Sequence, residues 1–255
     1  MSYDKAFTDA LQFAWGDGFL SPGGPAEVAA LLTDHDIHGL KLLDIGSGLG
    51  GVDLLLVGDH GADHVTGIDV DKWLVDQARA LVDGKGLSRR IDFCHVEPGP
   101  LPFADTSFDA VFSKDAMIHI PDKRSLYAEI LRVLKPGGFF IASDWLFAAG
   151  AAASPAVKAW LNDNPLGFTF TTLQEAEAAL YRAGFGDVRV VDRRIFLQAL
   201  NCAEIKLLEG PERMKLAAIV GEELALDRLR SARGRQGALD SGDLIPSHLS
   251  ARKPD

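Results

Sequence analysis

The glycine-rich segment Lys41–Gly51 constrains the fold of this chain more than any other part of its sequence. It begins with a short, mostly apolar run from Leu42 to Ile45, which is typical of a buried strand. Residues 52–57 then predict a helix whose free N–H groups face back toward the turn. The turn between them contains four glycines, which let the backbone bend sharply and approach a ligand closely: Gly46, Gly48, Gly50 and Gly51. A strand, a glycine turn and a helix in this order predict a nucleotide-type pocket.

Asp69 ends a second strand-like run, residues 64–68, about twenty residues after the turn, where a carboxylate can bind both hydroxyl groups of a ribose. The glycine spacing satisfies the dinucleotide fingerprint, so an NAD-dependent oxidoreductase is one interpretation. Asp44 favours another ligand, because a carboxylate before the first glycine repels a pyrophosphate and attracts a cation. A sulfonium compound with an α-amino group meets that condition. On this charge argument we favour the methyl donor S-adenosylmethionine.

Composition limits the class of protein further. A chain of 255 residues is long enough for one large α/β domain, and its formal net charge of −10 disfavours binding to nucleic acid or an anionic membrane. The two cysteines, Cys94 and Cys202, form neither a disulfide framework nor a zinc pattern, so we expect no metal site. Residues 1–19 lack the layout of a signal peptide, and no apolar run is long enough to span a bilayer. We therefore expect a cytoplasmic protein.

Strands and helices alternate along the first part of the chain. Further strands are predicted at residues 91–95, 107–113 and 139–143, and helices at 26–32, 71–87 and 125–134. This alternation predicts a doubly wound α/β fold with a mostly parallel sheet, in which ligands bind at the carboxyl ends of the strands. Asp69, Asp115 and His119 all follow predicted strand ends. We therefore expect them to lie around one crevice.

The remaining segments predict a cover over that crevice. The N-terminal residues combine aromatic and acidic side chains at helical spacing, and residues 146–170 are rich in alanine and aromatics. We expect one domain over residues 1–255, with a helical lid at 1–25, a donor-binding half at 26–145 and an acceptor-covering half at 146–255. In the last part we expect a helix at 172–183, a strand at 187–192, two helices over 193–233 broken at Gly210-Pro211, and a final strand at 248–253 beside the sixth.

Several motifs together resemble those of the class I S-adenosylmethionine-dependent methyltransferases. They occur in the family's order between residues 40 and 145: Leu42–Gly50, Gly67-Ile68-Asp69, Leu101-Pro102-Phe103 with Ser107-Phe108-Asp109, and Leu134–Gly138. The resemblance implies a Rossmann-like methyltransferase fold with a seven-stranded sheet and a helical insertion before the last strand. It also implies that the donor is S-adenosylmethionine and that the product is S-adenosylhomocysteine.

A closer resemblance is to the phosphoethanolamine N-methyltransferases. Its motifs are Phe19–Gly24, Ser113–His119 and Ser143-Asp144-Trp145. In that family a tyrosine near the N-terminus and a histidine after the fourth strand form a catalytic pair, which the resemblance places on Tyr3 and His119. The residues of that family that clamp phosphate have no match in the segment 162–168. We therefore expect a different small acceptor.

An amine acceptor must be neutral when it attacks the methyl group, so it needs a proton acceptor nearby. We assign that role to His119, oriented or assisted by Asp115 and Tyr3. Three aromatic side chains are candidates to face a methylated ammonium group by cation–π contact: Trp15, Trp145 and Phe168. The donor-binding candidates follow the strands and the first lid segment: Ser21, Asp44, Gly46, Ser47, Gly48, Asp69, Val70, Glu97, Pro98 and Lys114. We expect the side chain of Lys114 to face solvent. The four arginines between 228 and 235 are candidates to meet an acidic end of the substrate, but we favour a solvated helix face for them.

Alternatives stay open at this point. The same base and pocket would serve an O- or S-methyltransferase, since the acceptor atom is not determined by these motifs. An NAD-dependent oxidoreductase and a binding module with this fold but without catalysis are the other two interpretations. Whether the protein is a monomer or a homodimer is also left open.

Overall fold

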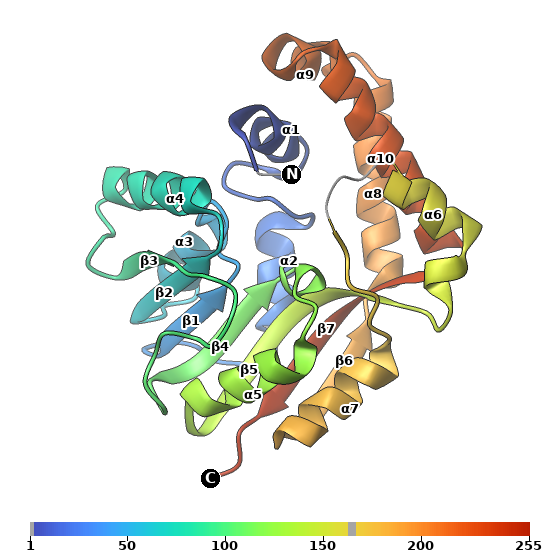
Figure 1. Cartoon of the computed structure of the whole chain (residues 1–255). Helices are drawn as coiled ribbons and strands as arrows, with labels where there is room; N and C mark the ends of the chain where they lie inside the picture. The colour runs from blue at the N-terminus through green and yellow to red at the C-terminus, as the bar shows by residue number, and fades with distance from the viewer. Residues whose placement is uncertain (1–2, 163–166) are drawn as a thin grey trace.

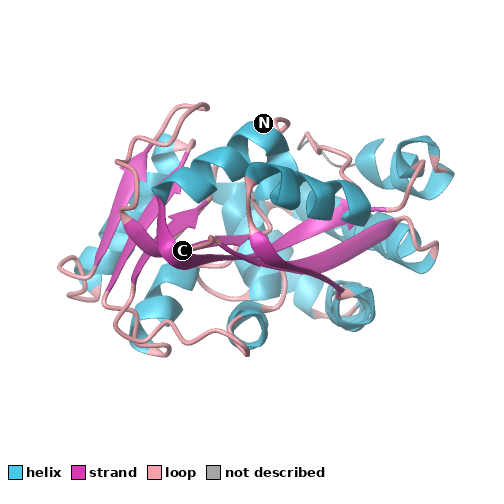
Figure 2. Ribbon diagram, turned by 90° about the horizontal axis from the view of Figure 1, so that it is seen from below, coloured by secondary structure: helices cyan, strands magenta, loops and turns pink. Residues whose placement is uncertain are grey.

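A computed structural model describes residues 3–162 and 167–255 of the chain. Its centre is a seven-stranded sheet with the strand order β3-β2-β1-β4-β5-β7-β6 (Figure 1). Helices cover both faces of this sheet (Figure 2). The strands are β1 (Lys41–Ile45), β2 (His64–Asp69), β3 (Ile91–His95), β4 (Phe108–Lys114), β5 (Leu134–Phe147), β6 (Gly186–Asp192) and β7 (Leu244–Arg252). The predicted doubly wound, seven-stranded α/β fold is confirmed.

Ten α-helices lie within the described ranges. They are α1 (Lys5–Trp15), α2 (Gly24–Leu31), α3 (Gly51–Gly58), α4 (Lys72–Gly84), α5 (Lys123–Val133), α6 (Pro155–Asn162), α7 (Leu173–Ala183), α8 (Arg194–Glu209), α9 (Glu212–Val220) and α10 (Glu222–Asp240). Two short 3₁₀ helices, η1 (Met117–His119) and η2 (Ala151–Ala153), follow β4 and β5. None of the helices in the described ranges is long and apolar enough to span a bilayer.

The five strands β1–β5 are parallel, whereas β7 is antiparallel and inserts between β5 and β6. The predicted pairing of the last strand with the sixth is therefore confirmed, but β7 pairs with β5 as well. Its register with β5 runs from Phe139↔Arg252 to Phe147↔Leu244. This long ladder keeps β5 extended to Phe147, four residues beyond the predicted end at 143. The segment 135–138, which lies between the predicted helix and the predicted strand, also belongs to β5, which begins at Leu134.

The prediction of two helices over residues 193–233 was wrong, because the chain forms three there. The additional break lies at Gly221, whose φ of +90° is outside the helical region and favours glycine. The helix that follows, α10, continues to Asp240, well beyond the expected end. Helices α8 and α10 stand together at one end of the sheet, with α1 on the same side of the sheet (Figure 1).

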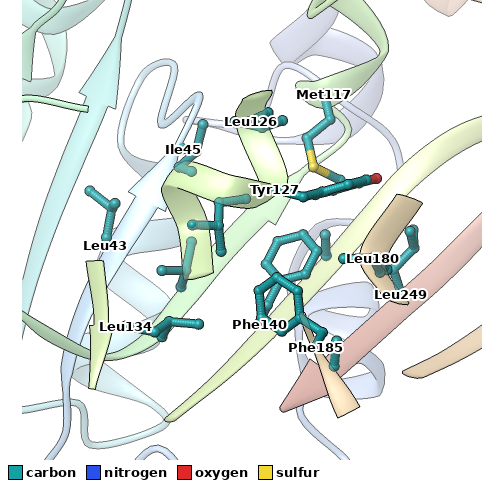
Figure 3. Packing of buried hydrophobic residues seen from close by; sticks show 14 of the residues in the cluster. Leu43, Ile45, Met117, Leu126, Tyr127, Leu134, Phe140, Leu180, Phe185 and Leu249 are labelled. Carbon is teal, nitrogen blue, oxygen red and sulfur yellow. The ribbon is translucent and has the colours of Figure 1, made fainter. Parts of the chain in front are cut away.

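Two apolar clusters pack on the two faces of the sheet. One lies between the sheet and helices α5 and α7 and contains Tyr127, Phe140 and Phe185 (Figure 3). The other lies under α2, α3 and α4 and contains Leu56 and Phe93. Burial of both faces explains why the strands read as continuous apolar runs in the sequence. A smaller cluster joins α1 to α8, α9 and α10, so the predicted lid is packed against the C-terminal helices.

Phe140 lies at the centre of the packing in the first cluster, because its ring is fully buried and packs against the rings of Tyr127 and Phe185. The substitution Phe140→Ala is expected to lower the free energy of unfolding by about 3–5 kcal/mol, through lost burial and the cavity left behind. Urea unfolding followed by circular dichroism measures this change. Tyr181→Ala, at a position 54% exposed, is the control and is expected to change stability by about 0.5 kcal/mol or less. Equal losses in the two variants would contradict this account of the core.

Candidate functional site

A cavity of about 890 Å³ lies at the carboxyl ends of β1, β2 and β4. This is the edge of a parallel sheet at which ligands bind in doubly wound folds. Residues from the glycine turn, from the ends of the strands and from the segment before α2 surround it. Its lining includes every donor-site candidate named from the sequence: Ser21, Asp44, Gly46, Ser47, Gly48, Asp69, Val70, Glu97, Pro98 and Lys114. The structure therefore brings together ten residues that lie up to 93 positions apart in the chain.

The glycine turn needs glycine at two of its positions for steric reasons. Gly46 has a φ of +80°, and a Cβ atom there would lie 2.2 Å from the Cβ of Ala116. At Gly51 a Cβ atom would lie 2.5 Å from the backbone oxygen of Gly18. The first contact involves the loop after β4, and the second involves the segment between α1 and α2. Both close approaches hold the glycine turn against parts of the chain that complete the cavity.

Asp69 is placed by its own hydrogen bonds. Its carboxylate accepts one from the backbone N–H of Gly48, at 3.0 Å, and one from that of Asp71, at 2.9 Å. Each oxygen keeps a second acceptor position, since an ionised carboxylate has about four. Burial raises the pKa of Asp69, while the two backbone donors oppose the shift. The side chain can therefore accept hydrogen bonds from a neighbouring pair of hydroxyl groups.

Behind the glycine turn lie two fully buried carboxyl groups, Asp44 on β1 and Asp53 on α3. One oxygen of Asp44 and both oxygens of Asp53 are buried without a hydrogen-bond donor among the described residues. Burial raises the pKa of Asp53 to about 7. Burial, together with the charges of Asp53 and Asp69, also raises the pKa of Asp44 well above its usual range. A proton or another cation near Asp44 relieves this repulsion.

The lining of the cavity is strongly acidic. It contains six carboxyl groups and a single lysine: Asp44, Asp69, Glu97, Asp115, Asp122, Glu129 and Lys114. Glu97 and Pro98 are exposed at its mouth, and Val70 is 58% exposed. Charges interact more strongly at a partly buried site than in bulk water. This acidic lining therefore attracts a cationic ligand and repels a pyrophosphate. The electrostatics thus agree with the charge argument made from Asp44 alone.

The expectation that Lys114 faces solvent was wrong. Its side chain is buried and its ammonium group donates hydrogen bonds to Ser21 Oγ at 2.6 Å, the Pro22 carbonyl at 2.8 Å and Asp115 Oδ2 at 2.9 Å. A buried ammonium needs such partners to offset its desolvation. Lys114 therefore ties the end of β4 to the segment that precedes α2.

A second, smaller pocket of about 120 Å³ opens beside the first. Five residues line both, so the two spaces meet there: Tyr3, Leu20, Ser21, Asp115 and His119. The walls of the small pocket include the aromatic candidates Trp15, Trp145 and Phe168. The segment 162–168 has no match to the phosphate-clamping residues, and its residues 163–166 lie outside the described ranges. The predicted catalytic and acceptor-binding residues all line this pocket.

His119 is oriented by a backbone carbonyl. Its Nδ1 lies 2.9 Å from the oxygen of Gly167, and since a carbonyl can only accept, Nδ1 carries the proton. In the neutral ring Nε2 then keeps its lone pair and can accept a proton. The carboxylate of Asp115 binds Ser143 Oγ and Lys114, and it makes no hydrogen bond to His119 among the described residues.

Tyr3 lies near the acids of the larger cavity. Burial, and then the charges of Asp69 and Asp71, raise the pKa of its phenol to about 12. The phenol is therefore a hydrogen-bond donor at neutral pH rather than a base. Among the described residues Tyr3 makes no hydrogen bond to His119, so the structure shows the two as neighbours on the pocket wall and not as a bonded pair.

For Arg228 and Arg235 the sequence favoured a solvated face over contact with an acidic end of the substrate, but both side chains line the small pocket. They are 5% and 2% exposed, respectively, and both bind Glu204 of α8. The other two arginines of the group, Arg230 and Arg233, are exposed as expected. A helical spacing of i, i+3 and i+7 places Arg228, Ser231 and Arg235 on one face of α10, but the spacing alone does not show that this face points inward.

Comparison with known proteins agrees with this arrangement. Residues 43–142 match the family described as a methyltransferase domain. Phosphoethanolamine N-methyltransferase 1 of Arabidopsis thaliana is 31% identical over 189 residues, which cover 73% of this chain and 37% of that protein. Sterol 24-C-methyltransferase ERG6B of Gibberella zeae is 34% identical over 155 residues, which cover 56% and 40%. The chain thus spans less than half the length of these relatives.

Among solved structures, phosphoethanolamine N-methyltransferase 2 of Haemonchus contortus, in complex with phosphomonomethylethanolamine and S-adenosylhomocysteine, matches with a TM-score of 0.91. The identity is 24%, and the match covers 99% of this chain and 59% of the other. This likeness establishes the fold, which is the Rossmann-like fold of the class I methyltransferases. The resemblance to the class I methyltransferases that the sequence motifs indicated is confirmed.

The pair Asp44 and Asp53 predicts a pH dependence of stability. Because the pKa of Asp53 is raised on folding, the folded state binds more protons than the unfolded state from about pH 4 to pH 7. The free energy of unfolding therefore falls as the pH rises through this window, by up to about 1.4 kcal/mol per unit. Asp53→Asn, which cannot ionise, is expected to flatten this slope in urea unfolding at pH 5, 6 and 7. Asp63→Asn, at an exposed position, is the control, and an unchanged slope in Asp53→Asn would contradict the assignment.

Proposed function

Because residues 43–142 belong to the methyltransferase domain family, we propose that this protein transfers a methyl group from S-adenosylmethionine to a small acceptor. We further propose that the acceptor atom is an amine nitrogen and that His119 accepts its proton. The observation that carries the proposal is a large acidic cavity that opens directly into a small aromatic pocket. A donor in the first space and an acceptor in the second would meet at the five residues that line both.

The volume and the acidic lining of the larger cavity suit the donor. Asp69 would hold the two ribose hydroxyl groups, and the acid-rich wall near Asp44 would attract the ammonium and sulfonium charges. Val70, Glu97 and Pro98 would border the base at the open side. The bound donor supplies an electrophilic methyl group. A dinucleotide would instead place its pyrophosphate among these carboxylates, which disfavours the oxidoreductase interpretation.

The residues of the small pocket would prepare the acceptor. An amine is mostly protonated at neutral pH, and it attacks only after it loses a proton to a base. The lone pair on Nε2 of His119 is available for that proton, while the Gly167 carbonyl holds the ring by its other nitrogen. The aromatic walls exclude water and align the nucleophile with the methyl group, which supplies most of the rate enhancement in a displacement of this kind. Asp115, already neutralised by Lys114, would position the acceptor rather than take its proton.

The size and polarity of the pocket argue against a sterol acceptor. A volume of about 120 Å³ is far smaller than the neighbouring cavity, and its far wall carries Asp227, Arg228 and Arg235. A large apolar acceptor would remove water from these charged groups without offering them a polar contact in return. A small polar molecule fits the pocket better than a sterol does.

The direct test is to incubate the protein with S-adenosylmethionine and a panel of small amines, thiols and acids, and to measure S-adenosylhomocysteine. Formation of that product above background for an amine is the expected result. Product with thiols or hydroxy acids alone would show that the acceptor atom is assigned wrongly. If no acceptor yields product although the donor binds, the chain is a binding module with this fold.

His119→Ala is expected to lower kcat by about 10²–10⁴-fold, because the pocket loses its proton acceptor. Donor affinity, measured by calorimetry with S-adenosylhomocysteine, should change by less than about threefold. His60→Ala is a matched control, since His60 lines neither cavity. Full activity in His119→Ala would remove His119 from the mechanism.

Asp69→Ala is expected to weaken the binding of S-adenosylhomocysteine by about 10–100-fold, because two charge-assisted hydrogen bonds are lost. Asp63→Ala, at a position outside both cavities, provides the comparison. Calorimetric titration of the three proteins measures the difference. Unchanged affinity in Asp69→Ala would show that the sugar is bound elsewhere.

A further inference from the structure

Two guanidinium groups form the wall of the small pocket on the α10 side. Arg228 lies over the ring of Trp15, with its Cζ 5.0 Å from the ring centroid. Arg235 lies between two indoles, with its Cζ 5.4 Å from the centroid of Trp15 and 5.7 Å from that of Trp145. Planar guanidinium groups stack on aromatic faces in this way and keep their N–H edges free for planar anions.

A single carboxylate serves both arginines. Arg228 donates to Oε1 of Glu204 at 2.6 Å, and Arg235 donates to Oε2 of the same group. Trp15 Nε1 donates to that second oxygen as well, at 3.0 Å. The remaining contact of Arg235 is neutral, a hydrogen bond from Nε to Asn201 Oδ1 at 2.6 Å. Glu204 thus offsets only one of the two positive charges.

The other acids of the pocket are paired elsewhere. Asp115 is neutralised by Lys114, and Asp227 contacts the exposed guanidinium of Arg230. Nε of Arg228 is buried and has no hydrogen-bond partner among the described residues. A buried donor left unpaired costs about 1–3 kcal/mol, and more when the group is charged. The described part of the pocket therefore has one excess positive charge and an unused donor on a residue that is 5% exposed.

We propose that Arg228 and Arg235 bind a carboxylate of the acceptor, so that the acceptor is a small amino carboxylate. The assignment rests on the proposed function, because it takes the small pocket to be the acceptor site. One excess positive charge matches a monoanion, whereas a phosphate dianion would leave a negative charge uncompensated at this buried site. With the carboxylate at α10, the amine end points toward Asp115 and His119 across the aromatic walls.

Equilibrium binding to the complex of the protein with S-adenosylhomocysteine tests the assignment without turnover. The probes are glycine and β-alanine, their carboxylate-free counterpart ethanolamine, and phosphoethanolamine. At least one amino carboxylate is expected to bind about tenfold or more tightly than ethanolamine, as a charge-assisted bidentate contact would produce. Tighter binding of phosphoethanolamine than of both amino carboxylates overturns the choice of carboxylate. Equal or absent binding of the amino carboxylates relative to ethanolamine overturns the anion site.

The variant Arg228→Gln keeps a polar side chain but removes the charge. It is expected to lose about tenfold or more in affinity for the amino carboxylate and to leave ethanolamine binding unchanged. Arg233→Gln, on the same helix but 58% exposed in its side chain and paired with Glu209, is the matched control and should bind like the unmodified chain. Equal losses for charged and uncharged probes in Arg228→Gln would reduce Arg228 to a structural role and overturn the assignment.

Failure of this assignment is distinguishable from failure of the proposed function. If the protein does not bind S-adenosylhomocysteine, the methyltransferase proposal fails before any acceptor is added. If it binds S-adenosylhomocysteine and methylates an amine without a carboxylate as well as one that carries it, the function stands and the carboxylate site is refuted. The comparison among probes on the unmodified chain requires no variant, so a misfolded Arg228→Gln protein would not prevent the test.

Discussion

The buried ammonium group of Lys114 holds the two halves of the site together. It stands at the end of β4 and binds Ser21, Pro22 and Asp115 at once, so one charge joins the central sheet to the segment before α2 and to the loop after β4. Asp115 in turn binds Ser143 on β5 and has a φ of +55°, a backbone state that needs such support. The two cavities meet beside this ammonium group, because its partners Ser21 and Asp115 line both of them.

Charge is distributed unevenly along the connected cavities. Carboxyl groups line the large cavity, and one of them, Asp44, is buried so deeply that its pKa is raised well above its usual range. The far end of the small pocket carries the guanidinium groups of Arg228 and Arg235. A molecule that lies across the small pocket therefore has the acidic large cavity at one end and the two arginines of α10 at the other. This polarity would orient a zwitterion in one direction, with its amine toward His119, before any close packing occurs.

The cover of the pocket is built from parts of the chain that lie far apart. Trp15 of α1 donates to Glu204 of α8, 189 residues away, and Glu204 binds two arginines of α10. Helix α1 is thereby held by the same carboxylate that offsets one of the two arginine charges. These helices lie outside residues 43–142, the part that matches the methyltransferase domain family. Residues within 43–142 form most of the large cavity, whereas α1 and α10, outside that range, form much of the small pocket.

Short-range sequence patterns determined the strand–glycine turn–helix unit, the acid at Asp69 and the parallel sheet, because the positive φ of Gly46 and the alternation of apolar runs act over a few residues. Tertiary structure decided the burial of Lys114, the contact of Gly167 with His119 and the inward face of α10. A charged side chain is buried only when distant partners offset its desolvation, and no local pattern states where those partners will lie. For the same reason α10 reads as a solvated arginine-rich helix in the sequence and forms a pocket wall in the folded chain.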